Sequence, residues 1–493
     1  MTTALQRTGQ DGLAGRLHRD AAAGGEAKRR QSWFVRDPAW PIVAALAGWP
    51  VWWALGIANQ IFILFAIPMA WRLYLSRARR GRRIQFPRGF GIWVLFMIVV
   101  LAGVAGLALT APETIATSVA NRYFSWTYRV FDYTAAAILL LYAGNLTERE
   151  LPRQRLAWLL GLVGIYAVAG GFLGVVDPHL SFTSPIAHLL PAKIQAGLSA
   201  SLNPGTAANM ANGLTGRVKA PFTFTNQWGN AIAITLPWLL VAWRSYGTRQ
   251  QGRLAVAIAA LAIVPVVLSQ NRGLWIGLLV AIVYLAVRLA LHGKMAPLVA
   301  LCGTLVLAAV IILASPLSTL INQRLHNGKS NSIRGSLTQI AIKDAESSPI
   351  IGYGDTRHMI GSPQSIAIGS NVNCHNCGNT SVGSNGQLQL LLVTTGFVGA
   401  GLYIGFFAYS AWRYRRDTTP YGMVGELVLV LGFVFMTVYE AAGPVLAFTM
   451  LAVALMWKND RELRNGNPAL ANSERFALQP ATAEGAAAGS LPA

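Results

Sequence analysis

Three basic residues stand beside apolar segments of the chain, where they could hold a phosphate group. Arg272 lies in SQNRG, a short turn between two apolar segments, and Arg217 and Lys219 precede another in RVKAPFTFTNQWG. A guanidinium matches the oxygens of a phosphate in geometry and charge. Contact with lipid headgroups, or snorkelling, is the alternative for Arg272. We favour an anion site, because several cations at one membrane boundary suit a lipid-linked phosphate or diphosphate.

Three further arginines are candidates for the same site. Arg334 begins a segment with helical spacing, IRGSLTQIAIKDAESSP. Arg122 and Arg129 are seven residues apart, so they share a helix face if both are helical. Asp132 follows Arg129 by three residues, which also allows an ion pair on a helix surface. Arg129 is therefore open to a structural role or a binding role.

Two residues could accept a proton from a hydroxyl group. His375 stands in NVNCHNCGN, and histidine is the usual general base because it titrates near neutral pH. Glu440 lies at the outer end of an apolar segment, where an ionisable side chain is functional by default. The alternative for Glu440 is an ion pair with one of the arginines.

Two cysteines, Cys374 and Cys377, flank His375. On the outer side of a membrane they would form a disulfide that orients the histidine, and free thiols or a metal site are the alternatives. A structural zinc site needs four ligands, and the sequence has no second cysteine pair. Asp344 and Glu346 resemble a metal-binding acidic pair only weakly. We expect no metal and no cofactor.

Membrane helices must position these residues. The chain of 493 residues is 54% hydrophobic and only 12% charged, whereas a soluble protein has roughly 25% charged residues. Apolar windows close to the roughly 20-residue length of a spanning helix recur along the chain. They lie at about 38–56, 58–76, 89–110, 125–145, 156–176, 228–243, 254–270, 273–291, 297–315, 387–412, 423–441 and 443–457. The sequence thus predicts an all-α integral membrane protein with about twelve transmembrane helices.

The distribution of charge gives the expected orientation. With both termini in the cytoplasm, 29 of the 40 Lys and Arg residues fall on the inner side, as the positive-inside rule requires. The net charge of +21 then reflects membrane topology and not nucleic-acid binding.

The ends of the apolar windows divide the chain. We expect residues 1–37 and 458–493 to be disordered cytoplasmic tails, because they are polar and Ala/Gly-rich. The other parts are a bundle of nine spans at 38–315 with an outward segment at 177–227, an extracytoplasmic loop domain at 316–386, and the last three spans at 387–457. Loops this long are usually functional, so chemistry is expected on the outer face.

Several motifs follow one another between about 210 and 410. Arg217–Gly229 combines an Arg, a Phe and an Asn-x-x-Gly entry to a span, and Ser269–Gly273 is a Ser-x-x-Arg-Gly turn. Residues 333–354 join an Arg-headed helix to a Pro-x-x-Gly-x-Gly turn, and the pair His375-Asn376 and GFVGAGLYIG follow. This ordered set resembles the O-antigen ligase/polymerase family of membrane glycan-transfer enzymes. One departure is the longer stretch, Cys377 to Gly386, between the His-Asn pair and the next span.

The resemblance implies a multi-span, GT-C-like glycosyltransferase in the cytoplasmic membrane. Its donor would be a glycan on polyprenyl (undecaprenyl) diphosphate, and its acceptor a glycan, lipid or protein on the outer face, with no nucleotide sugar involved. Carried over, the diphosphate would be held by Arg217, Arg272 and Arg334, and His375 would serve the acceptor hydroxyl. Arginines in place of a metal would stabilise the charge that develops on the diphosphate.

Three functions remain open from the sequence. A ligase moves the glycan to a different acceptor, whereas a polymerase of the same family moves it onto another lipid-linked repeat unit, and the residues do not separate the two. A lipid or polysaccharide transporter is the competitor from another class. It would show charged or broken helices at mid-membrane and internal repeats, whereas the ionisable residues here gather at the outer boundary.

Overall fold

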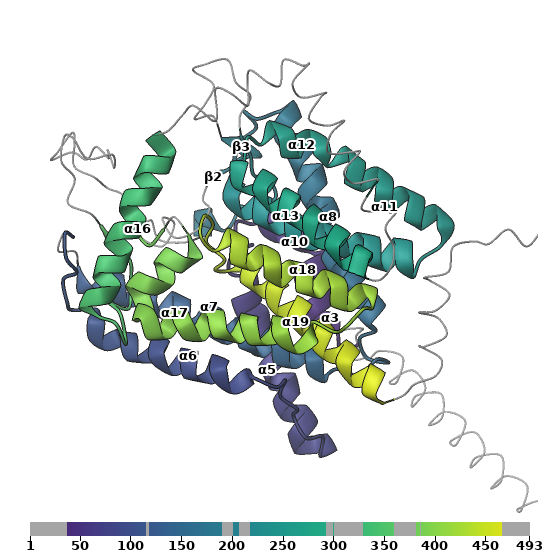
Figure 1. Cartoon of the computed structure of the whole chain (residues 1–493), viewed down its shortest axis with the longest axis horizontal. Coiled ribbons are helices and arrows are strands. Elements are labelled where there is room, and N and C mark those ends of the chain that lie inside the picture. Colours follow the sequence, from purple (N-terminus) through teal and green to yellow (C-terminus); the bar gives the residue numbers. More distant parts are fainter. Residues whose placement is uncertain are drawn as a thin grey trace, which may run out of the picture.

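The protein is mostly helical, as the sequence predicts (Figure 1). The computed structural model describes residues 37–114, 118–189, 201–206, 217–291, 299, 329–358, 381–384 and 386–465. The helices before residue 300 are α3 (Trp40–Ala47), α4 (Trp49–Ala54), α5 (Ile61–Arg80), α6 (Phe90–Ala102), η1 (Gly103–Gly106), α7 (Val119–Asn145), α8 (Arg153–Val176), η2 (Ala187–Leu189), α10 (Thr225–Leu240), the π-helical η4 (Val241–Ser245), α11 (Arg249–Leu261), α12 (Ile263–Leu268) and α13 (Arg272–Leu291). The later helices are α16 (Lys329–Ser347), α17 (Gln387–Tyr414), α18 (Pro420–Phe435) and α19 (Pro444–Arg464).

Short antiparallel strand pairs join the loops of the described segments. The pairs are β1 (Phe182–Thr183) with β2 (Ser201–Leu202), β3 (Gly205–Thr206) with β4 (Arg217–Val218), and β5 (Arg357–His358) with β6 (Ser381–Val382). The second pair fixes the segment that carries Arg217.

Five helical segments of the described chain are long and apolar enough to cross a membrane: α5, α8, α11 with α12, α13 and α17. Two shorter apolar helices, α6 with η1 and α18, accompany them. The prediction of an all-α membrane protein is thereby confirmed, while the number of twelve spans stays a prediction. The predicted span 297–315, apart from Val299, lies outside the described residues. So do the predicted tails, apart from Asp37 and residues 458–465.

Several helices differ from the predicted spans. The first predicted span is broken at Gly48 into α3 and α4, since Pro50 has no N–H with which to continue the helical ladder. The eleventh predicted span ends as a helix at Phe435 instead of residue 441, because backbone groups of the following turn form hydrogen bonds with Gln387 and Leu388. The last helix runs past residue 457 to Arg464.

The continuation of α19 has a clear cause. Lys458 is buried and its ammonium donates hydrogen bonds to the carbonyl oxygens of Leu146 and Leu151, at 2.9 and 2.5 Å. Asn459, also buried, donates to the carboxylate of Asp417 at 2.7 Å. These contacts hold the helix end against neighbouring loops, so the predicted disordered tail cannot begin at 458.

Close helix packing forms the core. A β-carbon at Gly161 of α8 would lie 2.7 Å from the Cα of Leu239 of α10, and one at Gly164 would lie 2.9 Å from the Cα of Leu236. Small residues of this kind let helix backbones approach each other in membranes. Most of α19 is buried against α7, α10 and α18, so the C-terminal helix lies at the centre of the bundle.

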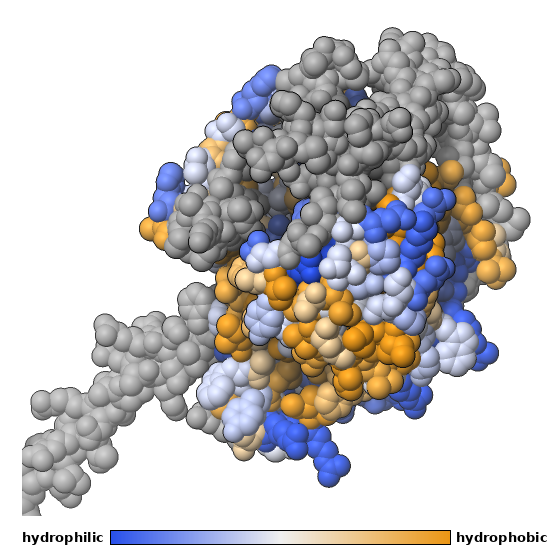
Figure 2. All heavy atoms as spheres, turned by 90° about the vertical axis from the view of Figure 1, so that its left-hand side faces the viewer, coloured by the Kyte–Doolittle hydropathy of each residue, from blue (hydrophilic) through white to orange (hydrophobic). Residues whose placement is uncertain are grey.

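Polar contacts gather at two ends of the bundle. At one end, Asn59, just before α5, donates a hydrogen bond to Thr223, just before α10, at 3.0 Å. We call this the site end, because the candidate functional residues lie there. The opposite end carries arginine–carboxylate pairs: Arg82–Glu150, Arg155–Asp37 and Arg413–Asp460. Figure 2 shows a broad apolar area on one face with hydrophilic residues at its borders.

Candidate active site

Asn271 joins three turns at the site end. Its carboxamide oxygen accepts a hydrogen bond from the hydroxyl of Tyr439, and its amide nitrogen donates to the carbonyl oxygen of Thr225 at 3.3 Å. Asn271 and Tyr439 are both buried. The start of α10, the turn before α13 and the turn after α18 therefore form one hydrogen-bonded unit.

Two glycines of the recognised motifs make room for this unit. A β-carbon at Gly229 would lie 2.6 Å from the amide nitrogen of Asn271, and one at Gly273 would collide with the hydroxyl of Tyr439. No other residue fits these positions without a shift of its neighbours. Steric contact with the Asn271–Tyr439 unit thus explains why both motifs, Asn-x-x-Gly and Ser-x-x-Arg-Gly, have a glycine at these positions.

Gln387, the first residue of α17, ties the turn around Tyr439 to the rest of the bundle. Its side chain accepts a hydrogen bond from the backbone N–H of Ala441 at 3.0 Å and contacts the hydroxyl of Tyr133 at 3.3 Å. Its own backbone N–H donates to the carbonyl oxygen of Tyr439 at 2.8 Å. The turn that carries Glu440 is therefore held from both sides.

Arg217 contacts the turn that carries Arg272. The Nε of Arg217, on β4, donates to the carbonyl oxygen of Ser269 at 3.4 Å, in the same turn as Arg272. Arg272 is half-buried at the first position of α13, and no hydrogen bond or ion pair joins its guanidinium to a described residue. Its positive charge is available to a ligand.

Lys219 is a second cation without a counter-charge. Its side chain is half-buried and makes no hydrogen bond or ion pair within the described segments, while its backbone N–H donates to Pro204 at 2.9 Å. Burial lowers the pKa of Lys219, because an uncompensated ammonium is costly away from water. A bound anion would relieve this cost.

Glu440 lies in the turn between α18 and α19, next to Tyr439. The side chain is accessible to water, and no described residue pairs with its carboxylate. Desolvation by the surrounding helix ends raises the pKa of Glu440, and the nearby positive charge of Arg129 opposes this rise. The alternative in which Glu440 forms an ion pair with an arginine is not realised, and the residue retains the character of a base.

Arg129 and Arg122 have structural partners. Arg129 forms an ion pair with Asp355 at 2.6 Å, and Asp132 instead accepts a hydrogen bond from the backbone N–H of Gly443 at 2.8 Å. The ion pair that the spacing of Arg129 and Asp132 allows is therefore not formed. Arg122 is buried and donates to the carbonyl oxygens of Leu107 and Leu109, at 2.9 and 3.2 Å. These contacts account for both charges without a ligand.

Arg334 lies on α16, as predicted, but its side chain is outside the described residues. α16 packs against α17 (Figure 1) and carries the fully buried Asp344. Both carboxylate oxygens of Asp344 lack a hydrogen-bond partner, and burial raises its pKa to about 7 although the charge of Arg357 opposes the rise. Glu346 is exposed on the same helix, so these two acids do not converge on a metal.

The Pro-x-x-Gly-x-Gly turn docks into a break in α17. Helix α17 departs from helical geometry at Gly396, with φ of 64°. The carbonyl oxygens freed there, those of Val393 and Thr394, accept hydrogen bonds from the backbone N–H groups of Tyr353 and Gly354 at 2.8 and 3.0 Å. The turn and the glycine-punctuated helix that the sequence showed as separate motifs therefore form one structure, and the predicted span 387–412 is not a single straight helix.

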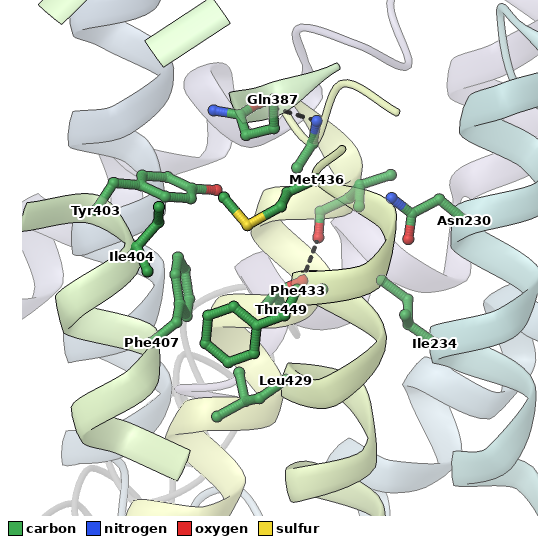
Figure 3. A pocket seen from close by; sticks show the side chains of 13 residues that line it. Asn230, Ile234, Gln387, Tyr403, Ile404, Phe407, Leu429, Phe433, Met436 and Thr449 are labelled. Carbon is green, nitrogen blue, oxygen red and sulfur yellow. Dashed lines mark hydrogen bonds between the residues drawn. The ribbon is translucent and has the colours of Figure 1, made fainter. Parts of the chain in front are cut away.

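An apolar cavity lies inside the bundle, with Gln387 at its site end (Figure 3). The cavity is small and partly open to the surroundings. Its walls come from α10, α17, α18 and α19: Asn230, Ile234, Tyr403, Ile404, Phe407, Leu429, Gly432, Phe433, Met436, Val445 and Thr449.

The predicted residues His375, Cys374 and Cys377 lie outside the described residues. Among the residues that the structure does describe, no group of three His, Cys, Asp or Glu side chains could hold a metal ion. Sequence reasoning missed Asn271 and Tyr439. Their position in the sequence could have pointed to them, since Asn271 directly precedes Arg272 and Tyr439 directly precedes Glu440.

Comparison with known proteins adds a family to this geometry. Residues 257–404 match the profile of the family described as O-antigen ligase. This segment is similar to the O-antigen ligase family. The O-antigen ligase segment contains the turn around Asn271, α13, α16, the Pro-x-x-Gly-x-Gly turn and the break in α17. It ends before α18 and α19, which carry Tyr439 and Glu440. No curated protein matches the chain significantly.

The match to the O-antigen ligase family supports a glycan-transfer function in a membrane. The family implies a lipid-linked glycan as donor and an acceptor at the membrane. The resemblance inferred from the sequence motifs is confirmed.

Proposed function

We propose that the protein transfers a glycan from a polyprenyl diphosphate to an acceptor hydroxyl on the outer face of the cytoplasmic membrane. The observation that carries this proposal is the position of two charged residues, one on each side of the Asn271–Tyr439 hydrogen bond. Arg272, which has no partner in the described chain, follows Asn271, and Glu440, equally without one, follows Tyr439. A cation for a leaving group and a base for an acceptor are thus attached to one rigid unit.

The cations act on the leaving group. Transfer breaks the bond between the anomeric carbon and a diphosphate oxygen, and the diphosphate leaves with the electron pair. Arg272 and Lys219 would stabilise this developing charge, with Arg217 beside them. Arg122 and Arg129 contribute less in this proposal, because carbonyl groups and Asp355 already hold them. The polyprenyl tail of the donor would extend from the site end along the apolar spans.

Glu440 acts on the acceptor. As the acceptor oxygen bonds to the anomeric carbon, its proton must pass to a base within hydrogen-bond reach. Glu440 is accessible, lacks a counter-ion among the described residues, and has a raised pKa that strengthens it as a base. His375 is the second candidate for this role on the strength of the family resemblance.

Reconstitution of the full-length protein tests this function. The purified protein in liposomes would be given a polyprenyl-diphosphate glycan and candidate acceptors, and products would be identified by mass spectrometry. We expect transfer in the presence of a chelator and without a nucleotide sugar. A product with one added glycan indicates a ligase, which we favour, whereas a ladder of repeat units indicates a polymerase. Absence of any transfer with all donors of this class would refute the proposal.

A further inference from the structure

Arg129 interacts with two carboxylates but forms an ion pair with only one of them. Its Nη1 lies 2.6 Å from the Oδ1 of Asp355. Its positive charge also acts on the carboxylate of Glu440, although no ion pair joins these two residues in the described part of the chain. The carboxylate that holds this guanidinium therefore decides how much of the positive charge reaches Glu440.

One face of α7 lies against the turn that carries Glu440. Arg129 and Asp132 are three residues apart on α7, so they share a helix face about 4.5 Å apart along the axis. The carboxylate of Asp132 accepts a hydrogen bond at 2.8 Å from the backbone N–H of Gly443, three residues after Glu440. Arg129 thus lies one helical turn from a residue that binds this turn directly.

Asp355 is fixed by the docked turn that precedes it. The carbonyl oxygen of Gly354, which belongs to the turn held in the break of α17, also accepts a hydrogen bond from Arg129, at 3.4 Å. The paired side chains are 15% exposed for Arg129 and 8% exposed for Asp355. Loss of one partner of such a pair leaves a buried charge without compensation. A guanidinium released from Asp355 would therefore pair with Glu440, whose carboxylate has no partner among the described residues.

We propose that Asp355 is a positioning residue for the base of the proposed reaction. It holds the guanidinium of Arg129 and thereby prevents an ion pair between Arg129 and Glu440. Such a pair would stabilise the ionised form of Glu440 and weaken it as a proton acceptor. The inference rests on the proposed function for the role of Glu440 in transfer, whereas the competition between the two carboxylates for one guanidinium is a property of the folded chain.

Three further titratable groups of α7 interact with Glu440: Asp132, Tyr128 and Tyr133. A negative charge on Asp132 opposes ionisation of Glu440, whereas tyrosine hydroxyls are neutral over the range in which a carboxyl group titrates. The start of α17 contributes the uncharged side chain of Gln387. A substitution at Asp355 changes none of these groups, so a difference between variants reports the charge of Arg129.

Direct titration of Glu440 in the full-length protein in liposomes tests the competition. The infrared band of its protonated carboxyl group would be followed against pH and assigned by its loss in Glu440→Gln. Asp355→Asn keeps the shape of the side chain and removes its charge, so the titration midpoint should move to lower pH by about one pH unit. Glu113→Gln is the matched control, because it breaks an exposed ion pair with Lys343 and should leave the midpoint unchanged. An unchanged midpoint in Asp355→Asn would overturn the proposal.

A variant without either charge tests whether Asp355 acts through Arg129. Arg129→Gln alone leaves Asp355 buried without a counter-charge and should destabilise the fold, whereas Arg129→Gln/Asp355→Asn leaves neither charge unpaired. In this double variant the midpoint should move to higher pH than in Asp355→Asn, because no guanidinium is present to pair with Glu440. The same low midpoint in both variants would overturn the proposal.

The pH–rate profile of transfer separates this inference from the proposed function. The acid limb of kcat should move to lower pH in Asp355→Asn, in parallel with the infrared midpoint, whereas a purely structural role of Asp355 would lower abundance and leave the limb in place. A moved midpoint without any dependence of transfer on Glu440 would refute the proposed base and support the competition for Arg129. An unchanged midpoint in a protein that transfers glycan would refute the competition alone.

Discussion

The hydroxyl of Tyr439 donates a hydrogen bond to the carboxamide oxygen of Asn271, and the chain neighbours of these residues are Glu440 and Arg272. A single buried contact thus joins the turn after α18 to the turn before α13. It holds Glu440, the candidate base, in a fixed position relative to Arg272, the candidate diphosphate-binding residue. The O-antigen ligase segment supplies only one half of this contact, because Tyr439 lies beyond residue 404. We expect activity to depend on this contact, because it holds the two turns together.

Tyr439→Phe should slow transfer while the protein remains folded. Removal of the hydroxyl leaves the Asn271 oxygen without this donor and loosens the two turns, at a cost of about 1–2 kcal/mol, which corresponds to roughly 5–30-fold in rate. The measurement is kcat and KM with a lipid-linked donor, together with the melting temperature. Tyr409→Phe is the matched control, because Tyr409 makes no hydroxyl contact with a described residue. A loss of stability with unchanged kcat per folded molecule would speak for a structural role only.

Glu440→Gln should remove the acid limb of the pH–rate profile along with most of the activity. The raised pKa of Glu440 means that the carboxylate becomes protonated, and loses its ability to accept a proton, at a higher pH than an ordinary glutamate does. The wild-type rate should therefore fall as the pH decreases through a value above the normal carboxyl range. Asp177→Asn, an exposed acid near the same end, is the control. A wild-type profile with no acid limb there would exclude Glu440 as the base.

Asp344→Asn should stabilise the protein at alkaline pH. The pKa of Asp344 is about 7 in the folded protein and 3.8 in an unperturbed chain, so the folded state holds a proton that the unfolded chain has already released. Stability then decreases as the pH rises from the lower value to the higher one. The isosteric amide removes this dependence and should add about 1–3 kcal/mol above neutral pH.

Denaturant unfolding at a series of pH values measures this effect. Glu346→Gln is the control on the same helix, because Glu346 is exposed. If the wild type and Asp344→Asn lose stability in parallel between mildly acidic and neutral pH, Asp344 is not the group that titrates.

Gly396→Ala should destabilise the junction between α17 and the Pro-x-x-Gly-x-Gly turn. The residue has a φ of 64°, and a β-carbon there would lie 2.5 Å from the carbonyl oxygen of Pro349. We expect a loss of about 2–4 kcal/mol in the free energy of unfolding, from backbone strain and displacement of the docked turn. Gly401→Ala in the same helix meets open space and should stabilise it slightly. Equal unfolding midpoints for the two variants would contradict this account of the break.

The sequence allowed prediction of features that depend on local pattern. Apolar windows predicted helices such as α8 and α13, and a cation in a short turn between two of them marked Arg272 as a residue that needs a ligand. The order of the motifs pointed to the O-antigen ligase family, which the match at residues 257–404 confirms.

Features that depend on long-range contacts could not be predicted in this way. The partner of Arg129 is Asp355, which is distant in sequence, whereas its local candidate Asp132 turns to Gly443. The break at Gly396 was not predicted, because its cause is the turn that inserts from residues 349–354. The sequence did not single out Tyr439, since only its contact with Asn271 reveals its role.

The most direct test of the central claim measures transfer from a defined polyprenyl-diphosphate glycan by wild type, Arg272→Ala and Arg272→Lys in liposomes. Loss of a group that stabilises developing charge typically lowers kcat by about 10²–10³-fold, and we expect this loss for Arg272→Ala at unchanged abundance and membrane insertion. Arg272→Lys should retain part of the rate, and Arg253→Ala, an exposed arginine at the opposite end, should retain all of it. Full transfer by Arg272→Ala would contradict the claim that this guanidinium holds the leaving diphosphate.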